Sequence, residues 1–161
     1  MPLEPPDLHH LSAAQGFASL GMFGDANAEL EEIDPFCRAL PEVLEIRLVI
    51  YQGTARWDLM QVVAEKLAQH DPGEPAWAIS CAYATRRAVS IEAAKPILMN
   101  ALERHPVDEL IHYNLACYDC QLGELSSAKE HLKKAFELQP KYRAMALDDP
   151  DLEPLWNLLQ H

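Results

Sequence analysis

The residues best suited to chemistry are two cysteines in the motif Cys117-x-x-Cys120. Thiolates at this spacing can bind zinc or exchange electrons, but a redox thiol is usually activated by a helix N-terminus, and a structural zinc site needs four ligands. The flanking residues indicate the middle of a helix, where His112 falls on a different face and His131 would have to approach from the next helix. We therefore interpret both cysteines as small packing or surface residues, and keep an accessory metal or redox protein as the alternative of another class.

The carboxylates and histidines form no catalytic constellation. Paired acidic residues occur at Glu31-Glu32 and in the run Asp148–Asp151, but acidic runs in a strongly acidic chain are usually solvated surface. The sequence contains no H-E-x-x-H, P-loop, G-x-S-x-G or dinucleotide-binding pattern. We expect a protein that is not an enzyme, with no catalytic residues, no metal and no cofactor.

Composition narrows the function classes further. The 161 residues carry 13 Lys and Arg against 25 Asp and Glu, a net charge of −12, which argues against binding to nucleic acid or to an anionic membrane surface. No run reaches the roughly 18 apolar residues that span a bilayer, and the first residues have neither the basic nor the apolar part of a signal peptide. Four cysteines are too few for a disulfide scaffold, so we expect reduced thiols in a cytoplasm.

The elements that position these residues repeat along the chain with a period of 34. Small or apolar residues fall into three columns spaced i, i+4 and i+7, which places them on one stripe of an α-helix. The columns are Ala26, Met60, Ala94, Ala128; Leu30, Ala64, Leu98, Leu132; and Ile33, Leu67, Ala101, Ala135.

Each repeat is interrupted in its middle and at its end. Gly21 and Gly123 share a column, where glycine can adopt the positive φ that ends a helix. Ser90 and Asp108 are expected to be helix N-caps. Three repeats close with a residue that stops helix propagation, namely Pro72, Pro106 and Pro140. Each repeat is therefore predicted to be a helix, a tight turn and a second helix.

A unit of this length, with small residues at positions 8, 20 and 27 and proline at 32, resembles the tetratricopeptide repeat. The fourth repeat resembles it most strongly, and the segment Ala146–Leu152 is similar to the terminal segment of many bacterial tetratricopeptide proteins. The resemblance implies an all-α, right-handed solenoid of four helix pairs ended by a capping helix. Its repeats would be residues 7–40, 41–74, 75–108 and 109–142, between an N-terminal extension (1–6) and a C-terminal capping segment (143–161).

The resemblance also implies where a partner would bind. In this family, recurring positions of each first helix line a concave groove. The corresponding residues here are Gln15, Glu42, Glu45, Val49, Gln52, Tyr83, Arg86, Arg87, Tyr113, Asn114, Cys117, Cys120 and Gln121. Tyrosine and arginine are frequent anchors in protein interfaces, so these residues are the predicted partner-binding surface.

We therefore expect a non-enzymatic scaffold of a bacterial cytoplasm that binds a peptide or a partner helix. A small secretion-chaperone-like protein is a close alternative, and self-association through the groove is a third. Only Asn114 matches the clamp by which some family members hold chaperone tails, because the paired cations that carboxylate recognition needs are missing.

Overall fold

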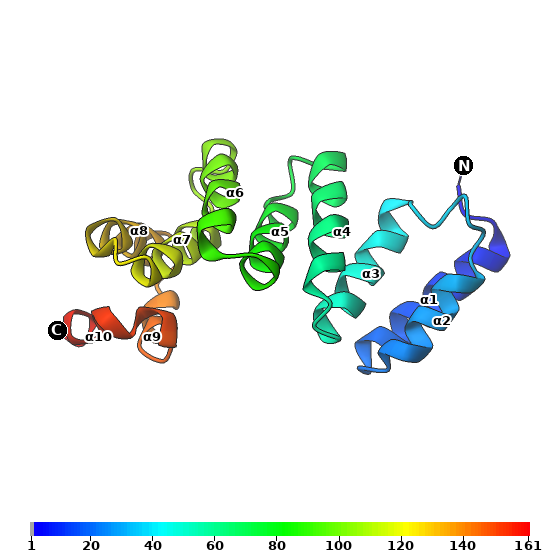
Figure 1. Cartoon of the computed structure of the whole chain (residues 1–161), viewed down its shortest axis with the longest axis horizontal. Coiled ribbons are helices and arrows are strands. Elements are labelled where there is room, and N and C mark those ends of the chain that lie inside the picture. The colour runs from blue at the N-terminus through cyan, green and yellow to red at the C-terminus, as the bar shows by residue number, and fades with distance from the viewer. Residues whose placement is uncertain (1) are drawn as a thin grey trace. The chain divides into compact units, whose positions relative to one another are not determined.

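The computed structural model describes residues 2–161, and these form helices without any strand. Figure 1 shows the order of the helices along the chain. The elements are α1 (Pro5–Ser19), α2 (Phe23–Glu32), α3 (Pro41–Gly53), α4 (Trp57–His70), α5 (Pro75–Ala88), α6 (Ile91–Arg104), α7 (Glu109–Gln121), α8 (Leu125–Leu138), α9 (Tyr142–Ala146), the 3-10 helix η1 (Pro150–Leu155) and α10 (Trp156–Leu159). The predicted all-α architecture of tetratricopeptide-like helix pairs with a C-terminal capping helix is confirmed.

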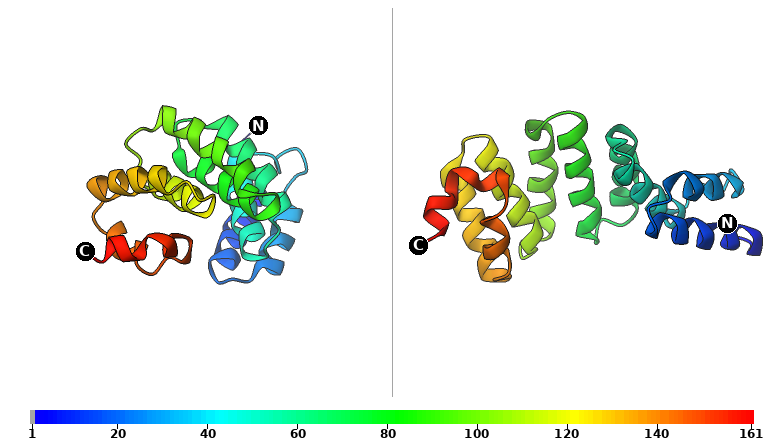
Figure 2. Two further views of the ribbon diagram at one scale, coloured as in Figure 1. Left: turned by 60° about the vertical axis from the view of Figure 1, so that its left-hand side comes forward. Right: turned by 90° about the horizontal axis from the view of Figure 1, so that it is seen from below.

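The chain divides into two compact units, one ending at Ala84 and the other beginning at Thr85, so the division falls within α5. Helices of a pair pack on each other, as α1 does on α2 and α7 on α8 (Figure 2). None of the helices within residues 2–161 combines the length and the apolar character that a membrane crossing requires.

The core of the first unit is built around small side chains. Ala14 of α1 and Ala26 of α2 are fully buried, and α1 and α2 both contact α3. Gly21 has a φ of 74°, so the predicted glycine turn between α1 and α2 is confirmed. The Gly21 amide donates to the Ala18 carbonyl over 3.0 Å, which satisfies a carbonyl at the end of α1.

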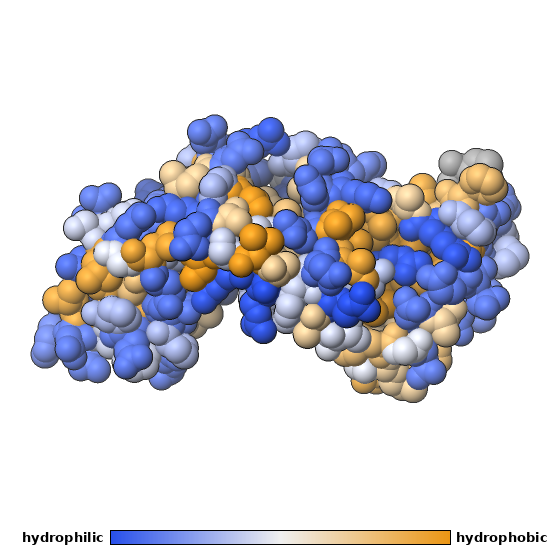
Figure 3. Space-filling view, viewed as in Figure 1, coloured by the Kyte–Doolittle hydropathy of each residue, from blue (hydrophilic) through white to orange (hydrophobic). Residues whose placement is uncertain are grey.

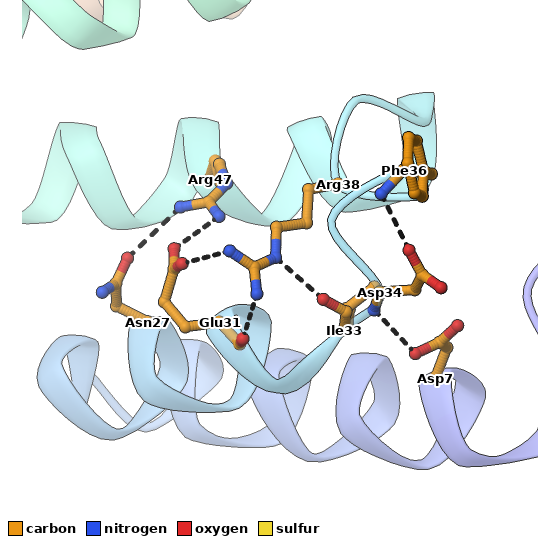
Figure 4. Close-up of polar contacts among 8 residues, drawn as sticks. All are labelled: Asp7, Asn27, Glu31, Ile33, Asp34, Phe36, Arg38 and Arg47. Atoms are coloured by element: carbon orange, nitrogen blue, oxygen red, sulfur yellow. Dashed lines mark hydrogen bonds and ion pairs between the residues drawn. The ribbon is translucent and has the colours of Figure 1, made fainter.

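The first repeat has Arg38 where the other three have proline, and this arginine closes the repeat with polar contacts. Arg38 Nε donates to the Ile33 carbonyl over 2.8 Å, and its guanidinium also binds Glu31. Figure 4 shows Arg38 and Arg47 converging on Glu31 from the loop and from α3. At the start of the same loop, the Asp34 amide donates to Asp7 over 3.0 Å. These contacts attach the loop and α3 to the first helix pair.

The second unit is organised around α7, which is buried almost all the way round. It contacts α6, α8 and η1, and its residues from Ile111 to Cys120 are buried except for the half-buried Asn114. The predicted caps and turn are confirmed here: Ser90 accepts from the Ala93 amide, Asp108 accepts from the Ile111 amide, and Gly123 has a φ of 79°.

Ala94 tests the packing of this unit. It is fully buried in α6, so Ala94→Leu should overpack the core and lower the free energy of unfolding by about 1–3 kcal/mol. Ala93→Leu is the matched control, because Ala93 is the exposed neighbour on the same helix. Urea unfolding of both variants measures the difference; equal stability of the two would show that Ala94 has room for the larger side chain.

Candidate interaction surface

In the first unit, the predicted groove residues lie at the surface. Gln15 is exposed on α1. Tyr83 of α5 is 37% exposed, and its ring meets Trp57 of α4 edge-on, with the ring centroids 5.6 Å apart. The other four are exposed on α3, namely Glu42, Glu45, Val49 and Gln52.

These four residues of α3 form one face of that helix, which we call the α3 face. Their spacing of three, four and three residues keeps them along a single stripe. The opposite side of α3 is buried through residues such as Val43, Ile46 and Ile50. Among residues 2–161, neither Glu42 nor Glu45 forms an ion pair, so two acidic groups and Val49, which is 46% exposed, remain open to solvent.

In the second unit, the predicted groove residues meet the chain's own C-terminal segment. Arg86 forms a bidentate pair with Asp151, with N–O distances of 2.5 and 2.8 Å. The Tyr113 hydroxyl donates to Asp149 over 2.9 Å, and the side-chain amide of Gln121 donates to the Asp151 carbonyl over 2.9 Å. The segment around η1 therefore covers this side of α7.

Both cysteines of the Cys117-x-x-Cys120 motif are buried, and Cys117 contacts the C-terminal segment. Cys117 Sγ lies 3.6 Å from Asp149 Oδ2 and donates to it, and burial raises the pKa of both the Cys117 and the Cys120 thiols. Burial and the hydrogen bond to Asp149 likewise raise the pKa of Tyr113.

In the second unit, most of the residues predicted to form the partner surface are therefore covered. Tyr113, Cys117 and Cys120 are buried, Asn114 is half-buried, and only Gln121 and Arg87 are exposed. The sequence pattern placed these side chains on one side of their helices, but it could not show that a later segment of the chain covers that side.

The metal or redox alternative is disfavoured by the same geometry. Ligand atoms of Cys117, Asp149 and Asp151 lie within 4.8 Å of one another, but Cys120 is not part of the group. A cation there would have to deprotonate a thiol whose pKa is raised and compete with the Arg86 guanidinium for Asp151. Hydrogen bonds and an ion pair already use these groups, so the cluster is better suited to holding the segment.

The C-terminal segment is also anchored by its apolar residues. Leu152 is fully buried and Leu155 is 1% exposed. Asp149 is the N-cap of η1 and accepts from the Asp151 amide over 3.0 Å. Trp156 donates through its indole nitrogen to the Ala146 carbonyl over 2.9 Å. Polar and apolar contacts therefore stabilise a single conformation of the C-terminal segment.

Sequence reasoning missed a buried polar cluster between α6, α7 and α8. Asp119 of α7 is fully buried; it accepts from the Ser127 hydroxyl over 2.5 Å and pairs with Lys95 of α6 at 2.7 Å. The hydrogen bond to Asp119 raises the pKa of Lys95. An aspartate inside an apolar helix pattern was the only signal of this cluster in the sequence.

Two histidines extend this cluster. His112 Nε2 lies 2.8 Å from the Pro106 carbonyl, so it is the protonated nitrogen and His112 Nδ1 accepts from His131 Nδ1 at 3.2 Å. His131 Nε2 lies 3.8 Å from Asp119. Desolvation by burial lowers the pKa of His131, and the Asp119 charge opposes this shift only in part.

Comparison with known proteins agrees with the fold. No family model and no curated protein matches the chain. Among solved structures, it is similar to a MamA RS-1 ArsTM double mutant, with a TM-score of 0.75 and 15% identity over 86% of this chain and 79% of the other. It is also similar to MamA MSR-1, with a TM-score of 0.68 and 18% identity over 98% and 96%, and to MamA AMB-1, with a TM-score of 0.68 and 18% identity over 95% and 87%. MamA is a tetratricopeptide-like helical protein, and at this identity the likeness shows the fold.

The Arg86–Asp151 pair gives a test of the C-terminal segment. Arg86→Glu should place two carboxylates together and lower the free energy of unfolding by about 1–3 kcal/mol, because both side chains are largely removed from water. Combining it with Asp151→Arg reverses the pair and should recover most of the loss. Urea unfolding of both variants measures this, and an unchanged Arg86→Glu protein would mean that the pair contributes nothing to stability.

His131 predicts how stability depends on pH. Its folded-state pKa lies below the ordinary value of 6.5, so below about pH 6.5 the unfolded chain takes up a proton that the folded chain resists. The free energy of unfolding should therefore fall as the pH drops from about 7.5 to about 5.5. In His131→Gln, whose amide can still donate to His112, part of this fall should disappear. His70→Gln, at an exposed histidine of the first unit, should keep it; an identical fall in all three proteins would contradict the role of His131.

Proposed function

We propose that this protein is a non-enzymatic interaction module that binds a peptide or a partner helix through the α3 face (Glu42, Glu45, Val49 and Gln52). One observation supports this above the others: the predicted groove residues of α3 are all exposed, while most other residues of that helix are buried or half-buried. A tetratricopeptide-like fold, which usually serves as a scaffold, agrees with the proposal. Gln15 and Tyr83 are the predicted groove residues of the same unit on α1 and α5.

The chemistry of this face indicates the kind of partner. The carboxylates of Glu42 and Glu45 form no ion pair with residues 2–161, so they would attract Lys or Arg of a partner. Val49 offers an apolar contact one turn beyond Glu45. A peptide or helix with basic residues beside an apolar one would satisfy both. Opposite charge would mainly speed association and select the partner.

The corresponding face of α7 is not part of the proposed site. Its tyrosine and cysteine are buried against Asp149, and Arg86 is paired with Asp151. A partner there would have to replace these contacts and also expose Leu152, which is fully buried. The α3 face needs no such rearrangement.

We also propose the cytoplasm as the compartment. All four cysteines, Cys37, Cys81, Cys117 and Cys120, are buried, and no disulfide joins them within residues 2–161. Thiols persist in this form in reducing compartments.

Charge reversal on α3 tests the proposed function. Partners captured by the intact protein would be identified by mass spectrometry, and their affinity measured by titration. Glu42→Lys combined with Glu45→Lys should weaken binding by about tenfold or more, because two attractive charges become repulsive.

The matched control is Glu32→Lys combined with Glu65→Lys. These residues are exposed on α2 and α4, so the net charge changes by the same amount away from the α3 face. If the control weakened binding as much as the α3 variant does, net charge alone would explain the effect. If neither variant weakened binding, the α3 face would be excluded as the binding site.

A further inference from the structure

A groove of about 490 Å³ opens on the surface of the second unit between α8 and the C-terminal helices. Its volume lies within the range of about 300–1,000 Å³ that is usual for binding sites. In the space-filling view, apolar side chains reach the surface over the C-terminal part of the chain (Figure 3). Residues of α8, α9, η1 and α10 line the groove.

The floor of the groove is apolar and continuous across two elements. Leu132 and Phe136 lie one turn apart on α8. Leu158 and Leu159 of α10 contribute the facing side, and Leu158 is 59% exposed. The capping segment therefore buries Leu152 and Leu155 but leaves an apolar strip of Phe136, Leu158 and Leu159 at least partly open.

The rim of the groove is basic, in contrast to the rest of the molecule. Residues 129–143 hold five of the chain's 13 Lys and Arg but only two of its 25 Asp and Glu, a net charge of +3 within a chain of −12. Two of these five, Lys134 and Lys141, lie outside the groove lining. Three cations, Lys129, Lys133 and Arg143, line the groove with one carboxylate, Glu137, so the lining itself is net positive. The Arg143 guanidinium lies over the Phe136 ring, 5.9 Å from its centroid. Positive charge is thus concentrated beside the open apolar strip.

We propose that this groove binds an amphipathic helix with acidic residues along the edge of its apolar face. Lys129 and Lys133 are one turn apart on an exposed edge of α8, a spacing of about 6 Å. Carboxylates four residues apart on a partner helix have the same spacing, while apolar residues on the adjoining stripe of that helix would rest on Phe136, Leu158 and Leu159. The acidic surface elsewhere on the chain would disfavour such a partner at other places.

Charge complementarity along the groove distinguishes this occupant from others. A fatty acyl chain would bring one carboxylate, whereas the cations stand at three places along the rim. A second copy of the chain would also be acidic, with a net charge of −12. Net charge alone, however, does not place carboxylates four residues apart beside an apolar stripe. The site is separate from the α3 face, so the two proposals can fail independently.

The experiment uses the intact chain and a fluorescent synthetic peptide of about 16 residues, long enough to form a helix. The peptide carries leucine at i, i+3, i+4 and i+7 and glutamate at the flanking positions; the matched peptide carries lysine there. Anisotropy titration should show saturable binding of the glutamate peptide that weakens as salt is added, and at least about tenfold weaker binding of the lysine peptide. Equal binding of both peptides, or binding of neither, would overturn the proposal.

Two variants locate the binding. Lys129→Glu combined with Lys133→Glu should weaken the glutamate peptide by about tenfold or more, whereas Lys134→Glu combined with Lys141→Glu, which makes the same charge change outside the groove lining, should weaken it far less. Leu158→Asp should also abolish binding of the glutamate peptide. Because Leu158 is largely exposed, the midpoint of thermal unfolding of this variant should stay close to that of the parent protein.

Other occupants would show themselves in the same series. If laurate displaced the glutamate peptide and bound more tightly than the peptide does, the proposal of a helical partner would be overturned. A concentration-dependent dimer that Leu158→Asp dissociates would also overturn it, since it would make a second copy the occupant.

Discussion

Close approach of helices within a pair is the constraint on which the structure depends, and small side chains make it possible. Ala14, Ala26, Ala64, Ala94, Ala116 and Ala128 have no exposed surface. Ala26, Ala94 and Ala128 share one column of the 34-residue period, in which the second repeat has the buried Met60 instead. Small side chains at such points let neighbouring helices approach closely. Ser90 and Asp108 then cap the start of α6 and α7, and Gly21 and Gly123 allow the turns that end α1 and α7.

The second unit adds a contact that the repeat pattern does not contain. Asp149 and Asp151 bind Tyr113 and Arg86, and Leu152 and Leu155 fill the apolar space next to them. The side of α7 that a repeat protein would offer to a partner is thereby used to complete the unit itself. Open surface is left at the α3 face and in the groove beside α8, and the two differ in charge: the α3 face is acidic and the groove is basic.

Sequence reasoning predicted the fold well because the fold is periodic. Alanine columns, capping residues and helix-breaking glycines act locally, and a 34-residue period shows them several times. The exposure of the candidate site residues was predicted only in part, because burial of Tyr113 and Cys117 depends on residues more than thirty positions later in the chain. The pairing of Lys95 with Asp119, and of His112 with His131, also depends on which side chains two packed helices bring together. No periodic pattern encodes such a pairing; Arg38, by contrast, broke the pattern and could have been recognised as a different way of closing a repeat.

The central claim is that the C-terminal segment covers α7 as a fixed part of the unit. Hydrogen–deuterium exchange of the intact chain, followed at the amides of Asp151 and Leu152, tests it most directly, since both amides donate to Asp149. We predict that they exchange in the same slow class as the amides in the middle of α7, because all of them would open only when the unit unfolds. Exchange of the two amides at the rate of an unstructured peptide, while α7 stays protected, would contradict the claim and return Tyr113, Cys117 and Arg86 to the surface available to a partner.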